Sequence, residues 1–319
     1  MTCSSASWRG PTRSSMPEPA RPGDGPPAAP LAPAVAAEQF RRACALDVAV
    51  RKPGNVSAAS PGHGMDAGLF LASARAAGAG LFGPAAPVGA RIEAAVAATL
   101  AVAGCNTNLG ILLLCAPLAR ALEAIPAGAG PAALRAALAE VLGTLDVDDA
   151  RAAYRAIAAA HPGGLGRAEA QDVHEAPTVT LLEAMRLAAS RDRIALQYAT
   201  GYADLFERGL PALAAALGAD RIVDARAVQV LYLALLAGFP DAHIVRKHGL
   251  ATAQAVTAEA APWLARARGG AALDADPAFA AWDESLKARG LNPGTSADLT
   301  VAALFMAGTS GIAILAVDP

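Results

Sequence analysis

VTLLEAMRLAASRDRIALQYATGYADLFE, residues 179–207, is the stretch that decides the fold class. Its apolar side chains recur at spacings of three and four residues, which places them on one stripe of an α-helix. The recurring residues include Leu181, Leu182, Met185, Leu187 and Ile194. No run of the chain alternates apolar and polar residues with the two-residue period of a half-buried strand. The sequence therefore predicts an all-α protein, with one helical pattern across residues 179–207.

The rest of the chain supports the same fold class. Of its 319 residues, 54% are hydrophobic but only 4% are aromatic, so the core must consist mainly of Ala and Leu. This composition favours closely packed helices over sheets. No G-x-G-x-x-G motif follows a strand, which argues against a Rossmann fold. Further helices are expected from about residue 37 to a stop at Lys52-Pro53-Gly54, at about residues 67–79, 88–103 and 111–124, from Pro131 onward, and from a cap at Asp146 or Asp148 to Ala160. The remaining helices are expected at about residues 211–218, 221–237, 249–268, 277–288 and 297–316.

Two regions are expected from this pattern. Residues 1–36 form a Pro/Ala-rich tail without an apolar run of signal-peptide length, and we expect this tail to be disordered. We expect residues 37–319 to form a single large multi-helix domain, in which widely separated helix termini meet at one polar cleft. The uncharged stretch 299–317 is long enough for a membrane span, but Thr309 to Gly311 interrupt it and no basic residues flank it. We therefore expect a core helix there.

Charge and cysteine content limit the partners and the location. The formal net charge is −2, which gives no reason to expect a nucleic acid or an anionic membrane as partner. The four cysteines form no C-x-x-C pair and show no metal-ligand spacing, so they are interpreted as reduced thiols. We expect a cytoplasmic protein whose partners are small molecules, and the sequence leaves a homodimer open.

Polar residues gather in six short segments, each at the boundary between two predicted helices. These polar segments are residues 52–57, 63–66, 105–110, 162–172, 240–249 and 292–298. Only three lysines occur among 26 basic residues, and two of them, Lys52 and Lys247, lie in these segments. Free backbone N–H groups at helix ends can bind a charged ligand. The distribution therefore points to an enzyme that acts on a phosphorylated small molecule.

The first two polar segments contain candidate phosphate-binding and acid/base groups. Lys52 and Asn55 flank Gly54, where the absence of a side chain lets backbone approach a phosphate closely. The simpler interpretation is that Pro53 and Gly54 only end a helix. His63 and Asp66 form a candidate acid/base pair, although Asp66 is also well placed to cap the next helix.

The third polar segment has three consecutive polar side chains between two apolar helices. Burying Asn106, Thr107 and Asn108 without partners would cost a few kcal/mol each, so they need backbone or ligand partners. A helix cap explains only one of the three. We therefore expect these residues, together with Gly110, to bind the ligand.

The fourth segment combines glycines with acids. Gly164 and Gly166 form either a flexible connection or a phosphate-binding loop. Glu169 and Asp172 follow, and Mg²⁺ prefers one or two carboxylates together with substrate phosphates. We therefore expect Mg²⁺ as a cofactor, held by these acids together with the phosphates of the substrate.

The last two segments are less specific. Arg246 and Lys247, flanked by His243 and His248, form either a solvated basic face or a triphosphate-binding cluster. Residues 292–298 are interpreted as a turn followed by the N-cap of the last helix.

Taken in order, the polar segments resemble the triphosphoribosyl-dephospho-CoA synthase family. The resemblance covers about residues 40–305 and is carried by Lys52-Pro-Gly, His63, Met65-Asp66, Asn106-Thr107, Gly110, Gly164-Leu-Gly166, Glu169 and Asn292-Pro-Gly-Thr-Ser-Ala-Asp298. It implies an all-α fold. It also implies a reaction in which ATP loses adenine while its ribose C1′ is joined to the 2′-hydroxyl of dephospho-CoA, with the triphosphate retained.

The resemblance suggests roles for the candidate residues. Displacement at ribose C1′ passes through an oxocarbenium-like state, which a carboxylate can stabilise. We expect Asp66 to act as base or oxocarbenium stabiliser and His63 as acid or orienting group. Lys52, Arg246 and Lys247 would hold phosphates, with Asp172 or Glu169 on Mg²⁺.

Two departures from the family pattern bear on the acceptor. Citrate-lyase-type members resemble Asn-Thr-His-Lys-Gly where this chain has residues 106–110, and Arg51 stands where a proline is usual. The chain is thus more similar to a sister branch from archaea and methylotrophs, which favours a different acceptor, such as a pterin-type cofactor precursor, as the alternative. An all-α nucleotide or ADP-ribose hydrolase and a helical binding module are the other readings. The sequence does not identify the acceptor or the number of metal ions.

Overall fold

The computed structural model describes residues 29–83 and 85–315. Most of the tail predicted for residues 1–36 lies outside the described residues. The first helix begins at Pro33, four residues earlier than predicted. Proline is favoured in the first turn of a helix because the N–H that it lacks would have no helical partner there. Residues 33–36 therefore belong to the helical domain.

The described residues confirm the all-α prediction. They form fourteen α-helices, one π-helix and one 3₁₀-helix, and within these ranges β-structure is limited to isolated bridges. The α-helices are α1 (Pro33–Ala49), α2 (Ala67–Leu81), α3 (Val88–Ala103), α4 (Leu109–Leu122), α5 (Pro131–Gly143), α6 (Val147–Ala160), α7 (Leu181–Ala188), α8 (Arg193–Thr200), α9 (Leu210–Ala216), α10 (Ala225–Leu236), α11 (Ala242–His248), α12 (Leu250–Arg268), α13 (Pro277–Ala288) and α14 (Gly294–Thr309).

The long helical pattern predicted across residues 179–207 is wrong as a single helix. It divides into α7, α8 and the π-helix Leu205–Gly209. Asp192 caps α8 by accepting a hydrogen bond from the backbone N–H of Ala195 at 3.0 Å, and Gly201 ends α8 with a positive φ of 62°. The apolar stripe continues across these breaks because all three pieces pack on the same core. Periodicity alone therefore cannot locate the breaks.

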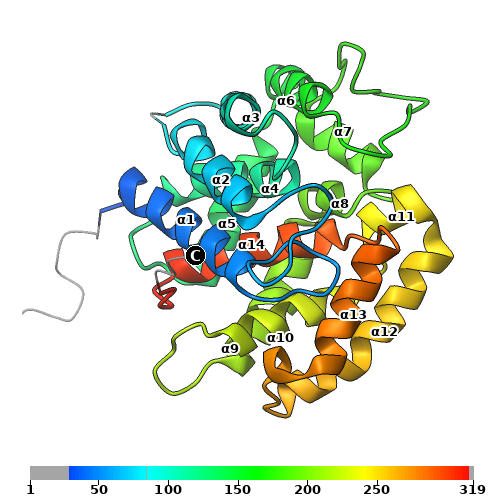
Figure 1. Cartoon of the computed structure of the whole chain (residues 1–319). Coiled ribbons are helices and arrows are strands. Elements are labelled where there is room, and N and C mark those ends of the chain that lie inside the picture. The colour runs from blue at the N-terminus through cyan, green and yellow to red at the C-terminus, as the bar shows by residue number, and fades with distance from the viewer. Residues whose placement is uncertain (1–28, 84, 316–319) are drawn as a thin grey trace, which may run out of the picture.

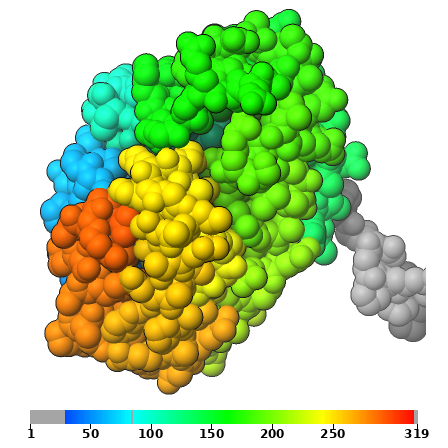
Figure 2. Space-filling model, turned by 90° about the vertical axis from the view of Figure 1, so that its right-hand side faces the viewer, coloured from blue at the N-terminus to red at the C-terminus, as the bar shows by residue number. Residues whose placement is uncertain are grey.

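The helices are arranged around α14 (Figure 1). Helices α1, α4 and α10 pack directly on it. Helices α2, α3 and α6 lie beyond α4 on one side, and α9, α12 and α13 lie with α10 on the other. Helix α11 and the start of α12 approach the segment that follows α6. The surface is hollowed where the yellow residues of α11 and α12 meet the green residues after α6 (Figure 2).

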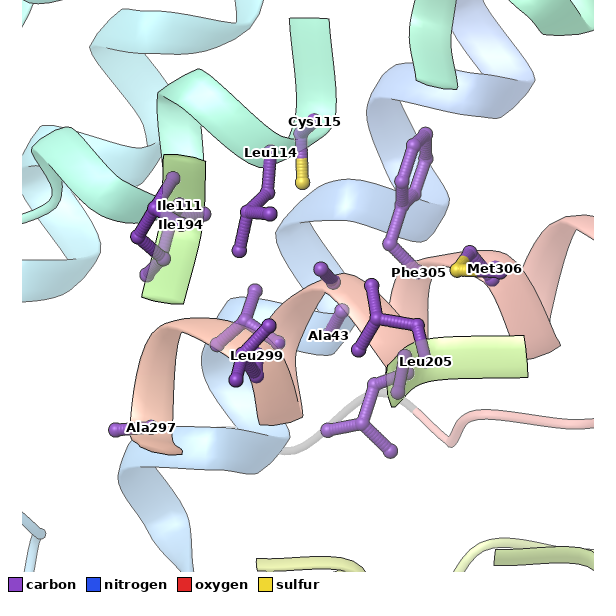
Figure 3. Close-up of a cluster of buried hydrophobic side chains, with 14 of the residues drawn as sticks. Ala43, Ile111, Leu114, Cys115, Ile194, Leu205, Ala297, Leu299, Phe305 and Met306 are labelled. Atoms are coloured by element: carbon purple, nitrogen blue, oxygen red, sulfur yellow. The ribbon is translucent and has the colours of Figure 1, made fainter. Parts of the chain in front are cut away.

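Helix α14 is apolar around most of its circumference, as expected for a helix at the centre of a core. Leu299, Phe305 and Met306 are completely buried against Ala43 of α1, and against Ile111, Leu114, Cys115, Ile194 and Leu205 of the surrounding elements (Figure 3). The helix spans residues 294–309, so the predicted range 297–316 is too late at both ends. None of the helices in the described ranges has the length and apolar character needed to cross a membrane.

Candidate functional site

One cavity of about 780 Å³ receives residues from all six polar segments. Its polar lining comprises Asp47, Asn55, Asn106, Thr107, Asn108, Gln171, Arg191, Asp192, Arg193, His243, Arg246, Asn292, Thr295 and Asp298. Gly110 and Gly164 also line it. The expectation that widely separated helix ends share a cavity is therefore confirmed.

The N-terminal residues of six helices line this cavity. They are Leu109 of α4, Leu181 of α7, Arg193 of α8, Ala242 of α11, Leu250 of α12 and Gly294 of α14. The N-terminus of a helix carries free backbone N–H groups and about half a positive charge from the helix dipole. Converging N-termini favour an anionic ligand.

Several buried polar atoms of this cavity have no partner in the protein. In the described part of the chain, eight buried side-chain atoms lack a hydrogen bond. Five of these eight belong to residues of the cavity lining: Asp47 Oδ1, Thr107 Oγ1, Asn108 Nδ2, His243 Nε2 and Arg246 Nε. An unsatisfied buried donor or acceptor costs about 1–3 kcal/mol. Their concentration at one cavity indicates that a polar ligand supplies their missing hydrogen bonds.

Asp298 is the most exceptional carboxylate of the cavity. It accepts no hydrogen bond from any described residue, and burial raises its pKa well above the usual value, with the charges of Asp241 and Asp47 adding to the shift. The segment 292–298 was interpreted as a turn plus N-cap, but α14 already begins at Gly294. Asp298 therefore lies inside the helix and faces the cavity, so the capping interpretation is wrong for this residue.

Gly110 allows α4 to lie directly against this carboxylate. A Cβ atom at position 110 would stand 2.0 Å from Asp298 Oδ2, far inside van der Waals contact. Any side chain there would displace the Asp298 carboxylate. Gly110 was expected to contact the ligand, and its position next to Asp298 gives it a further structural role.

His243 is a neutral group of the cavity rather than part of a cationic cluster. Burial lowers its pKa to about 3, and the nearby charges of Lys247 and Arg246 add to this shift. Because its Nε2 has no partner in the described structure, the neutral imidazole is free to accept or donate one hydrogen bond to a ligand.

The two predicted cations of this segment are placed differently. Arg246 lines the cavity, where its Nη1 binds Asp192 Oδ2 at 2.7 Å. Lys247 is exposed and does not line the cavity; its side chain packs on Gly163 and Gly164. Arg191, which was not selected from the sequence, lies at the cavity and has no ion pair with any described residue.

Lys52 does not face the cavity. It is completely buried, and its Nζ lies 3.1 Å from Asp47 Oδ2 and 2.9 Å from the Asp47 carbonyl oxygen. The ammonium is thus already occupied, and this geometry does not fit phosphate binding. Its partner Asp47 lines the cavity instead, so Lys52 positions a cavity carboxylate.

The neighbours of Lys52 divide in the same way. Gly54 has a φ of 82°, and a Cβ there would lie 2.7 Å from Pro293 Cδ. The space beside Gly54 is therefore occupied by another segment of the protein and not by a ligand. Asn55 does line the cavity and donates a hydrogen bond to Asn292 Oδ1 at 2.9 Å.

The predicted acid/base pair is exposed and outside the cavity lining. Asp66 Oδ1 accepts a hydrogen bond from the backbone N–H of Leu69 at 2.8 Å, which confirms it as the N-cap of α2. His63 Nε2 lies 2.8 Å from the carbonyl oxygen of Gly54. Met65, between them, is the residue of this segment that reaches the cavity. The geometry gives no support to a catalytic role for Asp66 or His63.

The predicted magnesium ligands do not fit a metal. Asp172 Oδ2 accepts a hydrogen bond from Ala168 N at 2.6 Å, while Oδ1 accepts from His174 N at 2.9 Å and lies 2.7 Å from His174 Nδ1. These hydrogen bonds lower the pKa of Asp172 to about 2. Glu169 is exposed, and neither acid lines the cavity, nor does Gly166. Residues 29–83 and 85–315 contain no group of three His, Cys, Asp or Glu residues arranged for a metal ion.

Comparison with known proteins identifies the family. The family model described as ATP:dephospho-CoA triphosphoribosyl transferase matches residues 33–313, almost the whole described chain. The chain belongs to this transferase family. The predicted family, the enzyme class and the family substrates, ATP and dephospho-CoA, are thereby confirmed.

The fold has a counterpart among solved structures. A protein from Archaeoglobus fulgidus, provisionally assigned as a triphosphoribosyl-dephospho-CoA synthase, superposes with a TM-score of 0.60 at 23% sequence identity. The match covers 76% of this chain and 100% of the archaeal chain. No curated protein matches the sequence. The structural likeness supports the all-α fold of the transferase.

Sequence reasoning missed Asp47 as a member of the site, named His243 only as a neighbour of the basic cluster, and interpreted Asp298 only as part of a turn and N-cap. Asp47 carried a signal, because it is a charged residue within the buried stripe of Phe40, Cys44 and Val48. Asp298 carried another, since it directly precedes a 19-residue uncharged stretch. An acid inside an apolar helix is either paired or functional.

Proposed function

We propose that the cavity lined by Asp298 is the active site of the transferase, where ATP donates its triphosphoribosyl group to the 2′-hydroxyl of dephospho-CoA. The observation that carries this proposal is the set of five partnerless polar atoms in a cavity that also contains Asp298, a carboxylate that accepts no hydrogen bond from the described residues. A folded protein retains such costly groups where a ligand pairs with them.

The triphosphate is assigned to the N-termini of α4 and α14 and to Arg246 and Arg191, all of which line the cavity. A triphosphate needs donors and positive charge, and these groups offer backbone N–H groups together with two guanidinium groups. Thr107 Oγ1, Asn108 Nδ2 and Arg246 Nε supply further donors that the protein itself does not use. Lys52 contributes indirectly, by holding Asp47 in place.

Asp298 is assigned as the general base. When the acceptor hydroxyl attacks C1′, a C–O bond forms, the C–N bond to adenine breaks, and adenine leaves with the electron pair. The hydroxyl proton passes to the Asp298 carboxylate. The departing adenine takes up one proton overall. Release of the proton from Asp298 balances this uptake and returns the carboxylate to its starting state. A carboxylate whose pKa is raised takes up a proton more readily than an ordinary one.

His243 and Asp47 are assigned supporting roles. The neutral His243 imidazole can hydrogen-bond to the substrate without adding charge beside the oxocarbenium-like carbon. The free Oδ1 of Asp47 adds negative charge on the same cavity, which favours that cationic transition state. No step is assigned to a metal held by Asp172 or Glu169. Magnesium, cytoplasmic location and a homodimer stay predictions.

Product analysis tests the proposal. The purified protein is incubated with Mg-ATP and dephospho-CoA, and adenine and nucleotide products are separated by chromatography. We expect one adenine for each conjugate whose mass equals dephospho-CoA plus the triphosphoribosyl group. Free ribose triphosphate would instead identify a hydrolase. Adenine release that requires a pterin-type acceptor rather than dephospho-CoA would reassign the acceptor.

A further inference from the structure

One wall of the active-site cavity is apolar, in contrast to its polar floor. The wall is formed by α6, α7 and the segment between them. Its members are Tyr154, Ile157, Leu165, Val173, Leu181, Ala184, Met185, Leu187 and Ala188. The Tyr154 hydroxyl donates a hydrogen bond to the carbonyl oxygen of Gln171 at 2.8 Å. The ring of Tyr154, rather than its hydroxyl, is therefore available to a ligand.

Three leucines extend this wall to the mouth of the cavity. Leu165, Leu187 and Leu250 are 37%, 52% and 54% exposed, and all three line the cavity. They come from the segment after α6, from α7 and from the start of α12. Among the described residues, only six large apolar side chains are this exposed, so half of them meet at one opening. Single exposed leucines are ordinary, but a cluster at a cavity marks a binding surface.

We propose that this apolar wall and its three leucines bind the pantetheine arm of the acceptor. The inference rests on the proposed function, because it takes dephospho-CoA as the acceptor. Of the two substrates, ATP consists of a base, a sugar and phosphates, and it has no aliphatic chain. Dephospho-CoA carries a long arm of methylene, methyl and amide groups. The apolar wall therefore matches a part that only the acceptor has.

The placement also sets the direction in which the acceptor binds. Its 2′-hydroxyl must reach the Asp298 carboxylate on the cavity floor, while the three leucines stand at the mouth. The nucleotide part of the acceptor therefore enters first and the arm extends outward. The amide groups of the arm need hydrogen-bond partners, and the backbone at Gly163 and Gly164 lies along the same wall. The wall would thus determine which acceptors are used.

Substitution at the mouth tests the assignment without disturbing the core. Leu187→Gln and Leu250→Gln, combined, replace two half-exposed side chains by a good helix former. We expect the KM for dephospho-CoA to rise about tenfold, because two apolar contacts are lost. The KM for ATP should stay within twofold. Leu315→Gln is the matched control, since Leu315 is also 54% exposed but does not line the cavity; it should change neither KM.

A fragment of the acceptor provides the second measurement. Phosphopantetheine, which is the arm with one phosphate but without the adenylyl group, should inhibit the wild type in competition with dephospho-CoA but not with ATP. The double variant should be inhibited more weakly. An unchanged KM for dephospho-CoA, a raised KM for ATP, or inhibition that competes only with ATP would overturn the assignment. Absence of any adenine release by the wild type would instead remove the proposed function, and the arm assignment with it.

Discussion

Asp172 and Asp298 are two carboxylates of the same protein with opposite surroundings. Asp172 accepts hydrogen bonds from two backbone N–H groups and contacts His174 Nδ1, and its pKa falls to about 2. Asp298 accepts none from the described residues, and burial raises its pKa. The first has its bonding capacity filled by its own segment. The second keeps its capacity for a ligand. A polar group that the fold leaves unpaired is therefore a better guide to this active site than an acid in a flexible segment.

The largest effect is expected from removing the unpaired carboxylate. Asp298→Asn keeps the shape of the side chain but cannot accept the hydroxyl proton, so kcat should fall by roughly 10²–10⁴-fold. The melting temperature should be unchanged or higher, because the variant no longer buries an unpaired charge. Adenine release and thermal unfolding measure the two quantities. A variant with unchanged kcat would show that Asp298 is not the general base. A variant that is inactive only because it is unfolded would show that Asp298, like Asp172, has a structural role.

A smaller loss is expected from moving the same carboxylate. Gly110→Ala places a Cβ where Asp298 Oδ2 now lies, so the carboxylate must shift. A displacement of about 1 Å in a catalytic group can cost roughly 10²-fold in rate. Gly78→Ala in α2 is the matched control, because no atom lies within 4 Å of its added Cβ. Equal kcat values for the two variants would contradict the close contact between Gly110 and Asp298.

The two acids should also differ in how stability depends on pH. The raised pKa of Asp298 means that its contribution to stability is fully present below about pH 3.9 and is lost as pH rises through its folded pKa. The stabilising effect of Asp298→Asn should therefore grow with pH. Asp172 has a lowered pKa, so its contribution is present above about pH 3.9 and is lost as pH falls through about 2. The penalty of Asp172→Asn should shrink toward acid.

Melting temperatures between about pH 2 and 8 test this difference in sign. Each variant is measured against the wild type in the same buffers. Opposite pH trends support the contrast between a filled and an unfilled carboxylate. Parallel trends for the two variants would show that Asp298 has partners in solution.

The smallest effect is expected at the exposed acid that the sequence favoured. Asp66 caps α2 from outside the cavity, and Asn is about as good an N-cap as Asp. Asp66→Asn should therefore keep kcat within about twofold of the wild type. A loss of kcat as large as that expected for Asp298→Asn would identify Asp66 as the base. It would contradict the preference for unpaired over paired carboxylates. Steady-state adenine release decides between these outcomes.

The sequence predicted much of the fold because helix periodicity and helix-ending residues are local signals. The predicted range 277–288 coincides with α13, and Asp66 caps α2 as its position suggested. The break between α7 and α8 was missed, because the apolar stripe runs on through the cap at Asp192.

The candidate site could be predicted as a region but not residue by residue. All six polar segments reach one cavity, because ends of packed helices meet where the chain turns. Which side chain points inward depends on tertiary partners that the sequence does not display. Lys52 forms an ion pair with Asp47, which lies in the preceding helix. Gly54 is needed for contact with Pro293, more than two hundred residues away in the chain.

A crystal structure of the Asp298→Asn variant with Mg-ATP and dephospho-CoA tests the central claim most directly. The nucleotide should occupy the cavity, with Thr107, Asn108, His243 and Arg246 as hydrogen-bond partners and the acceptor hydroxyl beside residue 298. The protein has a second cavity of about 780 Å³, lined by residues of α9, α10 and the π-helix, that contains none of the partnerless atoms. A nucleotide bound there, with the partnerless atoms of the first cavity still unpaired, would contradict the assignment.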